Sequence, residues 1–141
     1  MTHIDADDVS RLRAAIGRLS RQLNASVADI GFSPSQLSVL GTVARRGPIG
    51  IGELADLEGI NPTMLSRVVG KLSDADLIER IAHQDDGRAV VVQTTAAGRT
   101  LHQRVQDQRS KAMAARLEKM PDLQAAQLLA ALPALEALAA R

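Results

Sequence analysis

The chain contains no cysteine, tryptophan or tyrosine, and its only phenylalanine is Phe32. The absence of cysteine excludes disulfide bonds, thiolate metal sites and cysteine redox sensing. The scarcity of aromatic residues argues against a protein that binds single-stranded RNA or DNA, because such proteins stack unpaired bases on aromatic rings. Double-stranded DNA can be bound without such rings.

Long apolar runs are also absent. No segment approaches the ~20 apolar residues of a membrane-spanning helix, and residues 1–10 lack the apolar core of a signal peptide. We therefore expect a cytoplasmic protein that makes no membrane contact. Hydrophobic residues make up 45% of the chain, which is typical of a globular protein and not of a disordered one.

Charge alone indicates no partner, because the formal net charge is only +1. From Arg45 to Arg88, acidic residues even outnumber basic ones. A nucleic-acid-binding function would therefore depend on which face of an element carries the basic residues.

The segment from Asn61 to Leu72 predicts a helix with two different faces. Asn61 is a favourable N-cap, and Pro62 suits the first helical position. One face is an apolar stripe with helical spacing, formed by Leu65, Val68, Val69 and Leu72. The opposite face is small, hydroxylated and basic, and it carries Thr63, Ser66, Arg67, Gly70 and Lys71. Such a helix can bury its stripe and still lie in the major groove of DNA.

Long helices are predicted at both ends of the chain. The first runs from Asp5 to Asp29, and its apolar residues recur at spacings of three and four: Val9, Leu12, Ile16, Leu19 and Leu23, extended by Val27 and Ile30. This face packs either on its own domain or on a second copy of the chain. Thr95 caps another long helix that Pro121 ends, and Pro133 should kink or divide the last one.

Shorter elements are predicted between these helices. Gly31 ends the first helix, and Ser33 and Gln36 form a capping box around the start of the next. A very short strand at Ile49–Ile51 and a helix at Glu53–Glu58 lead through a glycine turn into the helix at Asn61. Two short helices joined by such a turn are typical of a helix-turn-helix.

A β-hairpin is predicted directly after the helix-turn-helix. The segments Leu77–Ala82 and Ala89–Thr94 have the two-residue period of strands. Asp86-Gly87 predicts the turn between them, because glycine readily adopts a positive φ. A hairpin in this position is a wing.

The order of these elements resembles the MarR family of bacterial transcription regulators over nearly the whole chain. The resemblance rests on four segments: Ile51–Ala55 and Asn61–Val69 for the helix-turn-helix, Leu77–Arg80 for the entry to the wing, and Asp86–Thr95 followed by Gly98-Arg99 for the wing and its exit. One departure is Asp86-Gly87-Arg88, where the family often has Asp-Arg-Arg. One positive charge is therefore missing from the wing.

The resemblance implies a homodimer that binds pseudo-palindromic double-stranded DNA, usually as a repressor. Small organic anions or aromatic compounds are expected to bind between the dimer region and the DNA-binding lobe and to weaken DNA binding. We expect one integrated, mostly α domain with a small β-hairpin. Residues 1–32 would form an N-terminal dimerisation helix, residues 33–95 the winged helix-turn-helix lobe, and residues 96–141 the C-terminal dimerisation helices.

Nine residues are predicted to contact DNA: Ser35, Gln36, Pro62, Thr63, Ser66, Arg67, Lys71, Asp86 and Arg88. The guanidinium of Arg67 matches the O6 and N7 atoms of guanine. Arg88 would enter the minor groove, oriented by Asp86. Ser35 and Gln36 open a helix whose free N–H groups suit a phosphate, although helix capping explains Ser35 equally well.

An enzyme has no support in the sequence, since no nucleophile and base can be paired and no catalytic residue is predicted. Gly50–Ala55 matches a dinucleotide-binding fingerprint without the βαβ unit that would give it meaning. The three histidines are scattered, so neither a metal site nor a cofactor is expected. The remaining alternative is a winged-helix module that binds protein instead of DNA. Such a module would need no basic face on the helix at Asn61.

Overall fold

The computed structural model describes residues 1–83 and 86–140, and for residues 83 and 86–89 it describes the backbone alone. Within these ranges the elements are α1 (Ala6–Ala25), the 3-10 helix η1 (Ala28–Ile30), α2 (Pro34–Arg46), β1 (Ile49–Gly50), α3 (Ile51–Glu58), α4 (Pro62–Asp74), β2 (Ile78–His83), β3 (Asp86–Thr94), α5 (Ala96–Glu118), α6 (Asp122–Ala130) and α7 (Leu132–Ala139). The predicted fold class, mostly α with a small β-hairpin, is confirmed.

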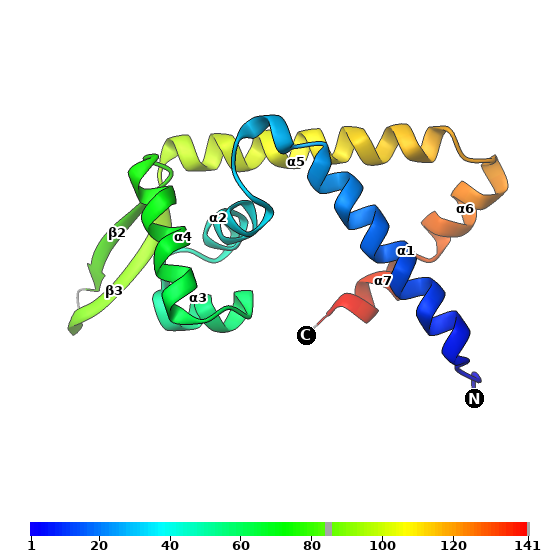
Figure 1. The fold of residues 1–141 in the computed structure, drawn as a ribbon, viewed down its shortest axis with the longest axis horizontal. Coiled ribbons are helices and arrows are strands. Elements are labelled where there is room, and N and C mark those ends of the chain that lie inside the picture. The colour runs from blue at the N-terminus through cyan, green and yellow to red at the C-terminus, as the bar shows by residue number, and fades with distance from the viewer. Residues whose placement is uncertain (84–85, 141) are drawn as a thin grey trace.

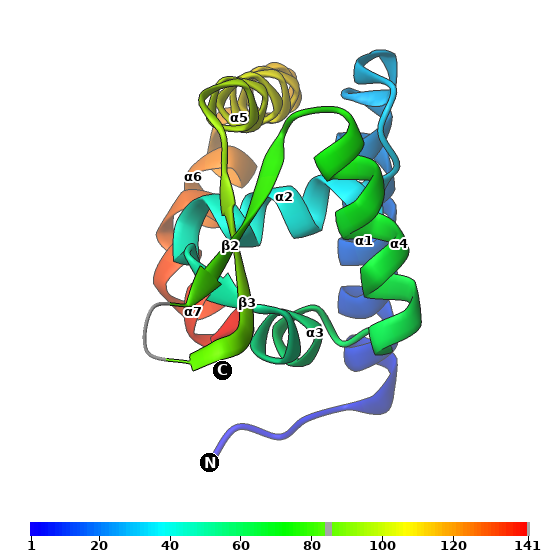
Figure 2. The same cartoon turned by 90° about the vertical axis from the view of Figure 1, so that its left-hand side faces the viewer.

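The long helix α5 organises the molecule. Helices α2, α3 and α4 and the β2–β3 hairpin lie beneath its first half, whereas α6 lies below its other end, α7 lies farther away from it and α1 descends from it (Figure 1). Figure 2 shows the same arrangement from the hairpin side, with α5 seen nearly end-on. We call the group formed by α2, α3, α4 and the three strands the winged lobe.

The sheet has the strand order β1-β3-β2, and both strand pairs are antiparallel. The predicted turn at Asp86-Gly87 is wrong, because both residues belong to β3 and His83 pairs with Asp86. The pairing continues through a register irregularity between Ala82 and His83 that alternation in the sequence does not reveal. The connection between the strands is therefore residues 84–85, which lie outside the described residues.

The main core lies inside the winged lobe. It is built from side chains of α2, α3, α4 and all three strands, of which the most buried are Val39, Leu40, Leu54, Leu65, Val69, Leu72, Ile78 and Val92. The predicted stripe of α4 supplies four of the core residues, so the packing of that helix follows from its sequence pattern.

The first helix is shorter than predicted. It ends at Ala25 instead of Asp29, and the chain turns at Ser26 into η1. Val27 does not extend the apolar face of α1. It is 1% exposed and packs in a second, smaller core with Leu37 and Val105. The chain turns here because burying Val27 between α2 and α5 is more favourable than continuing an exposed helix.

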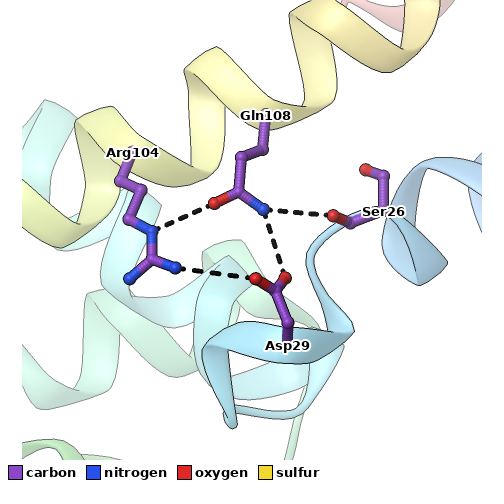
Figure 3. A network of polar contacts seen from close by, with 4 residues as sticks. All are labelled: Ser26, Asp29, Arg104 and Gln108. Carbon is purple, nitrogen blue, oxygen red and sulfur yellow. Dashed lines mark hydrogen bonds and ion pairs between the residues drawn. The ribbon is translucent and has the colours of Figure 1, made fainter.

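A polar network fixes this turn to α5 (Figure 3). The side-chain amide of Gln108 donates hydrogen bonds to the carbonyl of Ser26 at 3.1 Å and to the Asp29 carboxylate at 3.2 Å. Arg104 donates to the Gln108 side-chain oxygen at 3.0 Å and lies 3.6 Å from the second Asp29 oxygen. The junction between α1 and the rest of the molecule is therefore held by contacts between segments far apart in the sequence.

The terminal helices leave their apolar faces uncovered in the single chain. No residue of α1, α6 or α7 is buried. On α1, Val9, Leu12 and Ile16 are each about half exposed, at 50%, 46% and 47%. The apolar residues exposed on α6 and α7 are Leu123, Leu128, Leu129, Leu132 and Leu138. The division of the last helix near Pro133 is confirmed, since α6 ends at Ala130 and α7 begins at Leu132.

The start of α5 is anchored to the winged lobe at the base of the hairpin. Thr95 caps the helix by accepting a hydrogen bond from the Gly98 N–H at 3.0 Å, and its hydroxyl donates to the carbonyl of Asp76 at 2.6 Å. A Cβ atom on Gly98 would lie 2.0 Å from the Leu77 carbonyl oxygen, so only glycine permits this approach. Arg99 donates to the Thr94 carbonyl at 3.0 Å. The hairpin and α5 are thus joined without a flexible linker.

Candidate nucleic-acid interface

Helix α4 is positioned by local sequence signals and by its buried stripe. The Asn61 side chain accepts a hydrogen bond from the Met64 N–H at 2.8 Å, and Pro62 occupies the first helical position, as predicted. Leu65, Val69 and Leu72 are 0% exposed. The inner face of α4 is therefore fixed against the core, and its outer face has a defined orientation.

The outer face of α4 brings together five of the predicted site residues. All five are exposed: Pro62, Thr63, Ser66, Arg67 and Lys71. Neither Arg67 nor Lys71 has an ion-pair partner among the described residues. Met64, which the sequence analysis did not select, is 44% exposed, and helical spacing places it on the same side as Arg67 and Lys71. Its position outside the apolar stripe was the signal that could have identified it.

Helices α3 and α4 form the predicted helix-turn-helix. Gly59 ends α3 with a φ of 66°, a left-handed conformation that favours glycine. The Ile60 N–H then donates to the Ala55 carbonyl at 3.3 Å, and α4 begins two residues later. This tight connection holds the second helix against the first.

The wing residues predicted to contact DNA are only partly described. The backbones of Asp86 and Arg88 belong to the start of β3, at the end of the hairpin that lies away from α5 (Figure 1). Their side chains lie outside the described part of the structure, as does the proposed orientation of Arg88 by Asp86. The contacts of Asp86 and Arg88 with DNA and the orientation of Arg88 by Asp86 therefore remain predictions.

The two residues predicted at the start of α2 have different surroundings. The Gln36 side chain completes the predicted capping box, since its oxygen accepts a hydrogen bond from the Ser33 N–H at 2.9 Å while the Gln36 N–H donates to the Ser33 hydroxyl at 3.2 Å. Ser35 is exposed and lines a crevice beside α1. Capping therefore accounts for the Gln36 side chain, and contact of either residue with DNA remains a prediction.

The crevice has a volume of about 790 Å³ and lies between α1, α2 and α5, with the end of α3 at its edge. Its apolar wall is aliphatic, and its basic side chains are Arg45, His102 and Arg109. Burial lowers the pKa of His102, and the positive charges of Arg45 and Arg109 lower it further. This cluster was not predicted from the sequence because its members come from distant segments. The seven-residue spacing of His102 and Arg109, which places both on one face of α5, was the only signal.

Among the described residues, no three side chains of His, Cys, Asp or Glu gather in a way that could hold a metal ion. No helix in the same part of the chain is long and apolar enough to cross a lipid bilayer.

A helix-turn-helix with an exposed polar face on its second helix, followed by a β-hairpin, defines a winged helix-turn-helix protein. The model of the MarR family matches residues 32–90. The chain is 37% identical over 117 residues to the HTH-type transcriptional regulator MT0903.1 of Mycobacterium tuberculosis, covering 83% of this chain and 82% of that protein. The protein therefore belongs to the MarR family, and it is a DNA-binding transcription regulator.

One further relative and one solved structure are similar over most of this chain. The HTH-type transcriptional repressor MdtR of Bacillus subtilis is 26% identical over 124 residues, which cover 86% of this chain and 80% of that protein. The crystal structure of RV1404 from Mycobacterium tuberculosis matches with a TM-score of 0.81 and 26% identity, covering 100% of this chain and 99% of that one. The names of the relatives favour DNA binding over the alternative of a protein-binding winged module.

Proposed function

We propose that the protein is a repressor that binds a pseudo-palindromic DNA site as a homodimer and releases it when an organic anion binds in the crevice. The observation that carries the DNA part is the outer face of α4, where two hydroxyl groups and two cations with no ion-pair partner among the described residues lie opposite a buried stripe. A cytoplasmic location and the absence of enzymatic activity belong to the same proposal.

In this proposal Arg67 reads a base, and Thr63, Ser66 and Lys71 contact bases or phosphates from the same groove. Pro62 packs against the sugar-phosphate edge or a thymine methyl group. A bidentate contact of arginine with guanine contributes about 1–3 kcal/mol of discrimination against the wrong base. Arg67→Ala should therefore weaken binding to the specific site much more than binding to random DNA.

The test is fluorescence anisotropy with a duplex from the gene's own upstream region and with a random duplex of equal length. Arg116→Ala, which removes an exposed arginine from the far half of α5, is the matched control. The expected result is a loss of about 1–3 kcal/mol on the specific duplex for Arg67→Ala alone. Equal losses on both duplexes would show that Arg67 contacts only phosphate. No preference of the unmodified protein for any duplex would refute the proposed function.

The dimer is supported by the uncovered apolar faces of α1, α6 and α7. Contiguous exposed apolar surfaces of this kind mark association sites in folded proteins. A two-fold axis through these helices would place the two α4 helices in major grooves about one helical turn apart, near 34 Å. Leu12→Glu should give a monomer in light scattering at micromolar concentration, whereas Ala14→Glu, on the opposite face of α1, should leave the dimer intact. If the unmodified protein is monomeric under the same conditions, the proposed homodimer is contradicted.

The effector part is supported by the chemistry of the crevice. No Phe, Tyr or Trp is among its lining residues, so we expect weak binding of small aromatic acids, whereas the basic side chains suit an anion. A ligand can release DNA only if it binds the DNA-free form more tightly than the DNA-bound form. Ligand affinity should therefore be measured by calorimetry with and without the specific duplex. Equal affinities would exclude that ligand as an inducer.

A further inference from the structure

Met64 is an apolar side chain in the first turn of α4 that the core of the winged lobe does not cover. It is 44% exposed, whereas the four residues of the buried stripe are at most 7% exposed. Its spacing of three and seven residues from Arg67 and Lys71 places it beside both cations. Much of its apolar surface is therefore available to a partner that approaches the outer face of α4.

The backbone at Met64 is fixed. Its N–H donates to the Asn61 side-chain oxygen at 2.8 Å, and the next residue, Leu65, is 0% exposed in the core of the winged lobe. In a helix-turn-helix, the N-terminal residues of the second helix contact the edges of bases in the major groove. Met64 is thus placed where bases are read, and its three rotatable bonds let the side chain fit an irregular surface.

The chemistry of the thioether determines which group on a base Met64 can recognise. Methionine donates no hydrogen bond and is only a weak acceptor. Among the base edges of the major groove, the C5-methyl group of thymine is the apolar feature, and the other groups are hydrogen-bond donors and acceptors. Covering a donor or acceptor with Met64 would remove its water without a replacement. Contact with a methyl group instead removes apolar surface of both partners from water.

We propose that Met64 recognises the C5-methyl group of a thymine in each half of the operator. This inference rests on the proposed binding of a specific DNA site. The axial rise from Met64 to Arg67 is ~4.5 Å, which is close to the ~3.4 Å step between base pairs. The thymine should therefore lie within about two base pairs of the guanine that Arg67 reads.

Pro62, the other exposed apolar residue of α4, provides a matched control. Two positions of a helix differ by about 200° around its axis, so Pro62 and Met64 lie on opposite flanks of the outer face. They cannot contact the same methyl group. If Pro62 also touches a thymine methyl, that thymine occupies a different position in the operator.

The test replaces the thymines of the operator by deoxyuridine, one pair of symmetric positions at a time. Deoxyuridine keeps the hydrogen-bonding groups of thymine and lacks only the methyl group. At the position that Met64 contacts, affinity in anisotropy titrations should fall about fourfold per half-site, or ~15-fold for both, the equivalent of one buried methyl group each. Met64→Ala should weaken binding to the unsubstituted operator at least as much and should not respond at that position. Met64→Leu and Pro62→Ala should keep the response there.

A second substitution separates the methyl group from the rest of thymine. The same thymine–adenine pair is replaced by cytosine–guanine and then by 5-methylcytosine–guanine, which carries the methyl group on a different base. Methylation should raise the affinity of the unmodified protein about fourfold per half-site. It should leave the affinity of Met64→Ala unchanged. An equal gain in both proteins would show that Met64 does not contact the methyl group and would overturn the proposal.

Circular dichroism and thermal unfolding establish that each variant is folded before its affinities are compared. If the unmodified protein prefers the operator but no deoxyuridine substitution weakens it, the thymine contact is refuted while the proposed function stands. If Met64→Ala still responds at the same thymine, or loses affinity equally on operator and random duplexes, Met64 is not the residue that recognises the methyl group. An unmodified protein with no preference for any duplex would refute the proposed function and the thymine contact together.

Discussion

Gly70 offers a test in which the stability of the fold and the affinity for DNA should change in opposite directions. It lies inside α4, and a Cβ atom built there has no other atom within 4 Å apart from its own helix backbone and neighbours. Glycine in a helix interior costs about 0.8–1.0 kcal/mol relative to alanine. Since nothing in the described structure requires glycine here, Gly70→Ala should raise the free energy of unfolding by ~0.8 kcal/mol.

The position of Gly70 predicts the opposite effect on DNA binding. Helical spacing places it on the same side of α4 as Thr63, Ser66 and Arg67. We infer that the absence of a side chain lets the groove wall approach the helix, so a methyl group should weaken operator binding. The expected outcome is a protein with a higher urea midpoint and an unchanged denaturant slope, but a higher dissociation constant in anisotropy titrations.

Gly52→Ala in α3 is the matched control, because a Cβ there also meets nothing within 4 Å. It lies outside α4 and should leave operator affinity unchanged. A Gly70→Ala protein with unchanged operator affinity would refute close approach of DNA at this position. A destabilised Gly70→Ala protein would refute the reasoning about open space.

Three other measurements test separate parts of the molecule. Arg88→Ala should weaken operator binding and reduce the slope of log K against log[salt] by roughly 0.9 per lost phosphate contact, about twice that for a symmetric dimer; an unchanged slope would mean that Arg88 touches no phosphate. Leu72→Ala, at a core position that is 0% exposed, should cost about 2–5 kcal/mol of unfolding free energy in urea titrations. The pKa of His102 is lowered in the folded chain. As the pH falls, the unfolded chain therefore takes up a proton at a higher pH, near the ordinary histidine pKa of 6.5, than the folded chain does. The free energy of unfolding should therefore fall as the pH drops below about 6.5, and His102→Gln should reduce this dependence; identical pH profiles would contradict the assignment.

Local signals made the winged lobe predictable. The capping box at Ser33 and Gln36, the N-cap at Asn61 and the stripe of α4 each depend on residues within two helical turns, and all three were predicted from sequence. The five exposed residues on the outer face of α4 follow from the same periodicity. Such features survive in a single sequence because the interactions that create them are close along the chain.

The errors arose where distant segments meet. The end of α1 depends on contacts of Ser26 and Asp29 with Gln108, roughly eighty residues away in the chain. The basic wall of the crevice combines Arg45 with two residues of α5 in the same manner. Strand pairing near the tip of the hairpin was also set by a register irregularity and not by the Asp86-Gly87 signal. No local pattern encodes these contacts.

The anchored start of α5 makes this helix a lever. It has 23 residues, which correspond to a rigid rod ~35 Å long. Since its first turn is locked to the base of the hairpin, a tilt of roughly 10° at its far end moves the winged lobe by ~6 Å. That displacement is about half the ~12 Å width of a major groove. A small change of angle among the terminal helices is therefore enough to move α4 out of the position in which it fits the major groove. No change inside the winged lobe is needed.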